Sequence, residues 1–240
     1  NLAKYESNYT AIGGAHGGIW SYFRGNFDGR GHTVSGIRIY KGGTDESDRY
    51  QGLFGYTDYG ATIRGITLAD ARITGYNATG GIVGYNSGSS TVSHCHVAAS
   101  VAIHAVQNYA KDYGGIVGFN DNQATVSYCT SAATLTKTSS DGSESGGIVG
   151  INWGGTLSHN LAIGAVVPAD GDNCYGAICG WNRDGTLQNN YYLACTVAGV
   201  ENATDAGCGI AHKIGDFTYY YYSADVTDDY DAVPALRDNA

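Results

Sequence analysis

The chain has 240 residues, with 13 lysines and arginines against 22 aspartates and glutamates, and a formal net charge of −9. Nucleic-acid binding needs clustered basic side chains to neutralise phosphates, so this balance argues against a nucleic-acid partner. Glycine is abundant (37 residues), proline is scarce (2) and tyrosine reaches 20. This composition favours many short strands joined by tight turns. No run of about 18 apolar residues occurs, so we expect no membrane-spanning segment.

The N-terminal part of the chain shows no clear repeat. The chain starts at Asn1 rather than methionine, so we expect a mature or shortened protein from which a signal peptide has been removed. Residues 1–31 are expected to form an irregular first coil that caps the fold, because an uncovered sheet edge invites pairing with other chains. A leading copy of the repeat follows as HTVSGIRI at 32–39.

Residues 32–200 repeat a unit of about 30 residues. The pentapeptide GGIVG occurs at 80–84, 114–118 and 146–150, and GAICG follows at 176–180. Counting from the GLFG segment that ends at residue 55, the final glycines are 29, 34, 32 and 30 residues apart. These repeat-marking glycines are Gly55, Gly84, Gly118, Gly150 and Gly180.

Two further columns follow each of these glycines. The next residue is aromatic or large and apolar in every copy: Tyr56, Tyr85, Phe119, Ile151 and Trp181. The residue after that is asparagine in four copies: Asn86, Asn120, Asn152 and Asn182. Stacked asparagine amides can hydrogen-bond from one coil to the next, so we interpret this column as a structural ladder.

Strand periodicity dominates each unit. The segment TVSHCHVAASVAI at 91–103 alternates between β-branched and other residues, as strands do. A unit of this length cannot bury its own apolar face, whereas stacked units can. We therefore predict an all-β fold, a right-handed parallel β-helix with one coil per repeat and strands about 4.8 Å apart. Residues 201–240, where the pattern fades, are expected to form a C-terminal cap or a connector.

The repeats resemble a known family. The segments GGIVGYNSGSSTVSHC and GGIVGINWGGTLSHN are similar to the GLUG repeat, and FRGNFDGRGHTVSGI at 23–37 resembles the segment that leads such arrays. The family occurs in bacterial adhesin-like surface proteins and beside the catalytic region of immunoglobulin-cleaving metallopeptidases. The resemblance implies a non-catalytic module that is secreted or attached to the cell surface, and it identifies no ligand.

The glycine, cysteine and histidine residues favour structural roles. No lysine follows the pentapeptides as a phosphate-binding loop requires, so we interpret these glycines as sites of tight packing and positive φ at coil corners. Cys95 and Cys129 share one column, and buried thiols are favoured there over a disulfide. His94 and His159 share a column two coils apart, too distant to bind one zinc ion. We expect no metal and no cofactor.

No catalytic motif is recognisable, since both HExxH and GxSxG are absent. Asp58, Asp121 and Asp184 fall near one corner of the predicted coil but not in consecutive copies. The alternative function, a carbohydrate-active lyase or hydrolase on a β-helix scaffold, would need carboxylates that converge in one groove.

Exposed aromatic side chains are the best candidates for a binding site. Flat aromatic rings stack on sugars, and tyrosine and tryptophan anchor protein interfaces. The candidates from the sequence are Trp153, Trp181, Tyr191 and Tyr192. We therefore expect a non-enzymatic, adhesin-like binding or spacer module whose partner is a glycan or a host or cell-surface protein.

Overall fold

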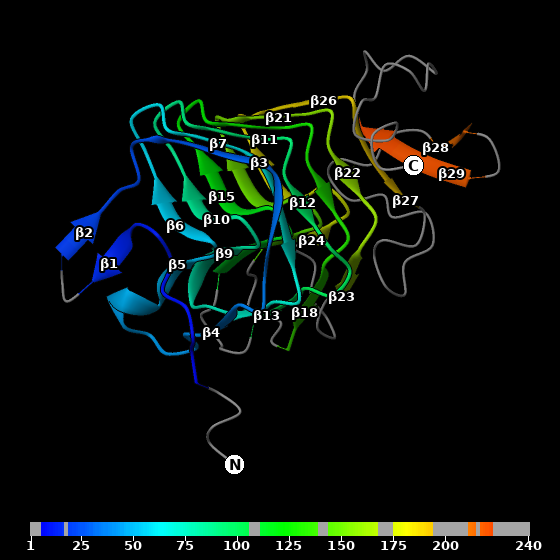
Figure 1. The fold of residues 1–240 in the computed structure, drawn as a ribbon. Helices are drawn as coiled ribbons and strands as arrows, with labels where there is room; N and C mark the ends of the chain where they lie inside the picture. Colours follow the sequence, from blue (N-terminus) through cyan, green and yellow to red (C-terminus); the bar gives the residue numbers. More distant parts are fainter. Residues whose placement is uncertain are drawn as a thin grey trace.

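The computed structural model describes residues 6–16, 19–105, 111–138, 144–167, 175–193, 211–214 and 217–222. Their backbone winds into a parallel β-helix in which equivalent strands of successive coils lie side by side (Figure 1). The predicted all-β parallel β-helix is thus confirmed. Most of the predicted C-terminal cap or connector, residues 201–240, lies outside the described residues, as do Cys174, Cys195 and Cys208.

Two of the sheets meet at the corner that follows the repeat-marking glycines. The first sheet consists of β6 (Phe54–Thr57), β10 (Val83–Asn86), β15 (Val117–Asp121), β20 (Val149–Trp153) and β25 (Cys179–Arg183). The second is the largest and contains β3 (Asn26–Ser35), β7 (Thr62–Ala69), β11 (Thr91–Ser93), β12 (His96–Val97), β16 (Thr125–Ser127), β17 (Thr130–Ser131), β21 (Thr156–Ser158), β22 (Leu161–Ala162), β26 (Thr186–Gln188) and β27 (Asn190–Leu193).

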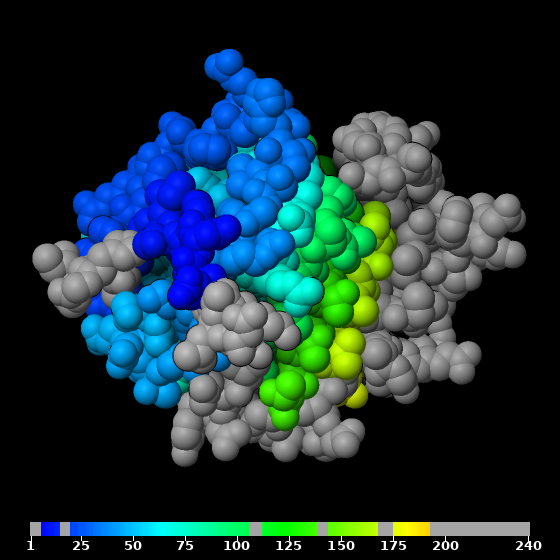
Figure 2. Space-filling model, turned by 60° about the horizontal axis from the view of Figure 1, so that its bottom comes forward, coloured from blue at the N-terminus to red at the C-terminus, as the bar shows by residue number. Residues whose placement is uncertain are grey.

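Two further sheets complete each coil. One contains β4 (Arg38–Tyr40), β8 (Arg72–Thr74), β13 (Ala102–Ala105), β18 (Thr134–Lys137) and β23 (Ala165–Val167). The other contains β5 (Arg49–Gln51), β9 (Asn77–Gly80), β14 (Lys111–Gly114), β19 (Ser145–Gly146) and β24 (Tyr175–Gly176). Figure 2 shows the coils as adjacent bands that follow the chain from blue to yellow.

The ends of the described fold carry the remaining elements. β1 (Gly14–His16) and β2 (Ile19–Ser21) form an antiparallel pair near the first coil. β29 (Phe217–Tyr222) pairs antiparallel with β27, and β28 (Ala211–Ile214) pairs with β29. The 3-10 turn η2 spans Glu46–Asp48. No helix in the described ranges is long and apolar enough to span a membrane.

The interior is filled by columns of apolar side chains that repeat from coil to coil. Because the strands pair in register, Ile63, Val92, Val126 and Leu157 lie directly above one another, and all four are buried. The isoleucines of the pentapeptides form a second buried column: Ile82, Ile116, Ile148 and Ile178. One continuous core therefore runs through the coils, as stacked repeats require.

The repeat-marking glycines pack tightly, but the positive φ expected for them is wrong. None of the five has φ in the left-handed region. A Cβ atom on Gly84 would lie 2.5 Å from the carbonyl carbon of Tyr50, and one on Gly150 would lie 2.6 Å from the carbonyl oxygen of Gly118. Glycine is needed here because neighbouring backbone occupies the space of any side chain.

Positive φ occurs instead at the corner between the two halves of the second sheet. Gly65 has φ of +63°, and the residues that follow it in this column are not glycine. They have φ between 50° and 57°: His94, Tyr128, His159 and Asn189. The corner thus demands a left-handed residue in every coil, a conformation that asparagine and histidine adopt more readily than most side chains.

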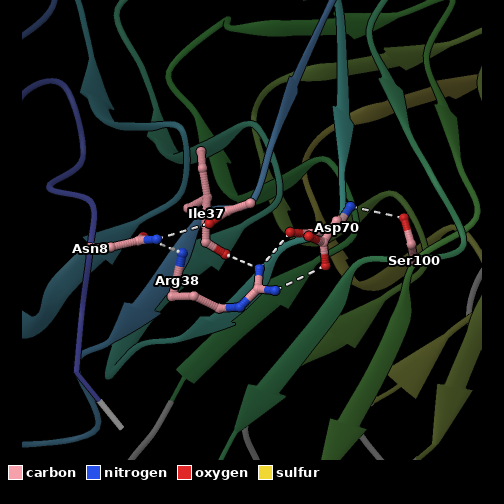
Figure 3. A network of polar contacts seen from close by, with 6 residues as sticks. Asn8, Ile37, Arg38, Asp70 and Ser100 are labelled. Carbon is pink, nitrogen blue, oxygen red and sulfur yellow. Dashed lines mark hydrogen bonds and ion pairs between the residues drawn. The ribbon is translucent and has the colours of Figure 1, made fainter. Parts of the chain in front are cut away.

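The start of the chain is more regular than the expected irregular coil. β3 pairs with β7 along both of its halves, so the expected boundary between residues 31 and 32 falls inside one strand. Ser7 and Asn8 cover the edge of β4 through hydrogen bonds to Tyr40 and Arg38. Figure 3 shows how Arg38 continues this network by an ion pair with Asp70, at 2.9 Å. These bonds satisfy backbone groups at an end of the sheet.

We expect alanine to be tolerated very differently at two glycines. Gly84→Ala should prevent folding or lower the free energy of unfolding by more than about 3 kcal/mol, because backbone atoms must move apart. Gly154→Ala should cost only about 1 kcal/mol, because Gly154 has φ of +66° but open space around it. Urea denaturation measures both values, and similar losses in the two variants would contradict the packing role of Gly84.

Candidate functional site

The asparagine column lies inside the fold. Asn86 donates its amide to Asn120 at 2.8 Å, Asn120 to Asn152 at 2.8 Å, and Asn152 to Asn182 at 2.7 Å. Thr57 begins the series by donating its hydroxyl to Asn86 at 2.7 Å. We refer to these four asparagines as the amide ladder. Asn86, Asn120 and Asn152 are fully buried, so their amides bond within the fold and are closed to solvent.

An aromatic strip covers the outer side of the same sheet. Its members come from the residues that flank the amide ladder, which point outward because neighbouring strand residues alternate between faces. The aromatic strip consists of Tyr22, Tyr56, Tyr85, Phe119, Trp153 and Trp181. Consecutive rings lie close together: Tyr22 and Tyr56 at 4.6 Å, Tyr56 and Tyr85 at 4.8 Å, Tyr85 and Phe119 at 4.9 Å, and Phe119 and Trp153 at 6.3 Å between centroids.

Ring orientation changes along the strip. Tyr85 and Phe119 are nearly parallel, with 13° between their planes, so each covers a face of the other. Tyr22 and Tyr56 meet edge to face at 73°. The rings are therefore stacked in the middle of the strip and tilted against one another towards its first coil.

The last two coils hold its most exposed rings. Trp153 is 40% exposed and Trp181 is 41% exposed. The guanidinium of Arg183 lies 4.0 Å from the ring centroid of Trp153 and 5.7 Å from that of Trp181. Arg183 follows Trp181 by two residues and pairs in register with Trp153, so the three side chains form one surface cluster.

The first coil has a matching cluster. The guanidinium of Arg24 lies 5.4 Å from the ring centroid of Tyr22 and 4.2 Å from that of Tyr59. Tyr59 is 66% exposed. Each end of the strip thus combines one arginine with two aromatic rings, an arrangement worth about 0.5–1 kcal/mol per contact at exposed sites.

Polar side chains lie beside the rings. The hydroxyl of Tyr85 donates to the carboxylate of Asp121 at 2.7 Å. Burial, followed by this hydrogen bond, raises the pKa of Tyr85, and burial raises the pKa of Tyr56 to about 12. Both phenols therefore stay protonated at neutral pH and can donate hydrogen bonds. The carboxylate of Asp58 accepts from the backbone N–H of Tyr59 at 2.7 Å.

Two of the four predicted binding residues are not on this surface. Tyr191 and Tyr192 are 2% and 1% exposed, so their prediction as ligand-contacting rings is wrong for this structure. Both lie in β27, which has β22 on one side and β29 on the other. The ring of Tyr192 belongs to the hydrophobic core.

The histidines form a stack without metal-site geometry. Tyr128 separates His94 from His159, with centroids 5.0 Å and 4.8 Å away and nearly parallel planes. The expected distance of two coils between these imidazoles is thus confirmed. Within the described ranges, no group of three or more histidine, cysteine, aspartate or glutamate side chains could hold a metal ion.

The described cysteines are buried thiols: Cys95, Cys129 and Cys179. The favoured interpretation of Cys95 and Cys129 as thiols is confirmed. In later coils their column changes to asparagine, and Asn160 accepts a hydrogen bond from the backbone N–H of Cys129 at 3.0 Å. The column keeps its structural role although the residue type changes.

Comparisons with known proteins give little guidance. No protein-family model matches the chain, and no solved structure matches it. A segment of 67 residues is 37% identical to part of halomucin from Haloquadratum walsbyi (strain DSM 16790 / HBSQ001). This match covers 28% of the chain and 1% of halomucin. The candidate site therefore depends on the geometry of the chain itself.

We expect removal of one ladder amide to destabilise the fold strongly. In Asn120→Ala, the buried amides of Asn86 and Asn152 each lose a hydrogen bond, as does the carbonyl of Ala124. Unsatisfied buried groups cost about 1–3 kcal/mol each, so urea denaturation should show a loss of at least about 2 kcal/mol. Gln188→Ala, at an exposed position, is the control. Equal stability of the two variants would disprove the role of the ladder.

Acid should also weaken the fold. Burial lowers the pKa of His96, His104 and His159 below the ordinary value. The unfolded chain, with histidine pKa near 6.5, then binds protons at a higher pH than the folded chain. Stability should therefore be complete above about pH 6.5 and fall as the pH drops through the unfolded and then the folded values. Thermal melts should show a weaker fall in His159→Gln, and an unchanged fall would contradict the contribution of His159.

Proposed function

We propose that this chain is a non-catalytic, adhesin-like binding module of a secreted or cell-surface protein, and that its ligand, a glycan or a protein, contacts the aromatic strip. The observation that carries this proposal is the strip itself. Outward rings from successive coils form one surface that ends in the exposed pair Trp153 and Trp181. Tryptophan, tyrosine and arginine are also the side chains that contribute most to binding energy at interfaces.

The arrangement of the carboxylates favours binding over catalysis. Asp58 and Asp121 occupy one outward column, but Ser87 lies between them, which places them about 10 Å apart along the axis. Glycoside hydrolysis needs two carboxyl groups about 5–9.5 Å apart on opposite sides of the scissile bond. Both aspartates instead bond to tyrosines of the same surface. The alternative function, a carbohydrate-active enzyme, is tested by the experiment below.

The setting of the module is inferred from the sequence. The resemblance to GLUG repeats supports a bacterial surface protein, and the low charge, net −9, supports a partner other than nucleic acid. A β-helix also gives a rigid body, since each coil is hydrogen-bonded to its neighbours. Such a body can hold a binding surface away from the cell, which suits both the adhesin and the spacer role.

The test combines a glycan array and an array of extracellular proteins with a reducing-end assay on polysaccharides. We expect retention on one of the arrays without release of reducing ends. The double variant Trp153→Ala/Trp181→Ala should lose at least about tenfold in affinity, or ~1.4 kcal/mol. Ile163→Ala, which changes an exposed apolar residue outside the strip, should bind normally. Sugar release that disappears in Asp58→Asn or Asp121→Asn would refute the proposal and support the enzyme.

A further inference from the structure

The two ends of the aromatic strip carry the same short motif. Tyr22-Phe23-Arg24 stands in the first coil and Trp181-Asn182-Arg183 in the last described one. A parallel bridge between Phe23 and Thr57 places Tyr22 level with Tyr56 and Arg24 level with Asp58. The pairing of successive coils then continues these two columns to Trp181 and Arg183. The two arginines therefore occupy equivalent positions of one outward column.

The column that joins the arginines has a defined length and composition. From Arg24 it passes Asp58, Ser87, Asp121 and Trp153 before it reaches Arg183. These are five steps between coils of about 4.8 Å each, or roughly 24 Å in all. The neighbouring column runs from Tyr22 to Trp181. It holds a ring in every coil except one, where the buried Ile151 stands and Trp153 of the first column supplies the ring. The surface runs parallel to the axis of the β-helix, and Tyr50 widens it at the first coils, where its ring lies 5.3 Å from Tyr56 and 5.0 Å from Tyr85.

This shape fits an extended polymer better than a globular partner. A stable protein interface buries about 800 Å² on each side and involves about 20–30 residues. The strip, with its flanking column, contains about half that number. A single polymer chain that lies along the axis would contact both columns over their full length. Its rings could pack against Tyr59 and Trp181 at the ends, where aromatic side chains are most exposed.

The charges along the column favour an uncharged ligand. Arg24 and Arg183 at the ends are offset by Asp58 and Asp121 between them, and Asp184 adds an exposed carboxylate beside Arg183. The net charge of this column is therefore close to zero, and the net charge of the whole chain is −9. Neither the column nor the chain as a whole attracts a polyanion electrostatically. The guanidinium donors of Arg24 and Arg183 and the carboxylate acceptors of Asp58 and Asp121 together match a ligand rich in hydroxyl groups.

We propose that the strip binds one chain of an uncharged polysaccharide that lies parallel to the axis, with its two ends held by the Arg24 and Arg183 clusters. This inference rests on the proposed function and specifies its ligand. A pyranose ring in an extended chain is about as long as one step between coils, ~4.8 Å. The surface between the clusters therefore accommodates about five sugar rings.

The experiment is isothermal titration calorimetry of the intact chain with uncharged oligosaccharides of increasing length. The probes are cello-, manno-, laminari- and chito-oligosaccharides from dimer to octamer, with oligogalacturonates as the charged comparison. For at least one uncharged series, affinity should rise with length and level off near the pentamer. Arg24→Gln and Trp181→Ala, at opposite ends, should each weaken binding of the hexamer about tenfold. Ile163→Ala should leave binding unchanged.

Several results would overturn this inference and leave the proposed function standing. One is an affinity that does not depend on oligosaccharide length. Another is tighter binding of oligogalacturonates than of every uncharged series. A third is a loss of hexamer affinity in Trp181→Ala with no loss in Arg24→Gln. Absence of binding to all of the oligosaccharides would also overturn it, and retention on the protein array would then identify the other ligand class. If the hexamer binds equally well to Trp153→Ala/Trp181→Ala, both the inference and the assignment of the strip fail.

Discussion

The close approach of consecutive coils is the constraint on which the other features depend. Gly84 and Gly150 allow neighbouring backbones to lie where a Cβ atom would otherwise be. The parallel hydrogen bonds between strands set the spacing of the coils, and their register places each side chain over its equivalent in the next coil, inside and outside the fold. The same register aligns the amide ladder inside the fold and the aromatic strip outside it, because the two occupy alternate positions of the same strands.

The inner and outer columns differ in what they can do. Asn120 has every amide group engaged with Asn86, Asn152 or Ala124, so it has nothing to offer a ligand. Phe119, one residue earlier, is partly exposed and contacts other rings. Function is therefore expected on the outer columns, where changes in residue type from coil to coil do not disturb the interior. The change from Asp121 to Trp153 to Arg183 along one column illustrates this freedom.

Much of the fold could be predicted from the sequence because its repeats are columns in space. The spacing of Gly55, Gly84 and Gly118 predicted the coils, and the asparagines that follow predicted the ladder. The position of positive φ could not be predicted, since the corner holds His94, Tyr128 and His159 rather than glycine. Their φ depends on how the two halves of the second sheet meet.

The candidate site was predictable only in part. Of the four candidate rings, Trp153 and Trp181 are exposed, whereas Tyr191 and Tyr192 are buried. Tyr192 belongs to the hydrophobic core, which the fading repeat pattern around it did not indicate. Arg24 and Tyr59 were missed because they lie before and beside the recognised repeats. An aromatic residue two positions before an arginine, present at both ends, is the sequence signal that could have found them.

The most direct measurement is a crystal structure of the chain with a hexasaccharide of an uncharged glycan that it binds. Our account predicts that the sugar rings lie in one row over β6, β10, β15, β20 and β25, parallel to the axis, with the two ends beside Arg24 and Arg183. A hexasaccharide bound on another sheet, or lying across the coils at a single level, would contradict it.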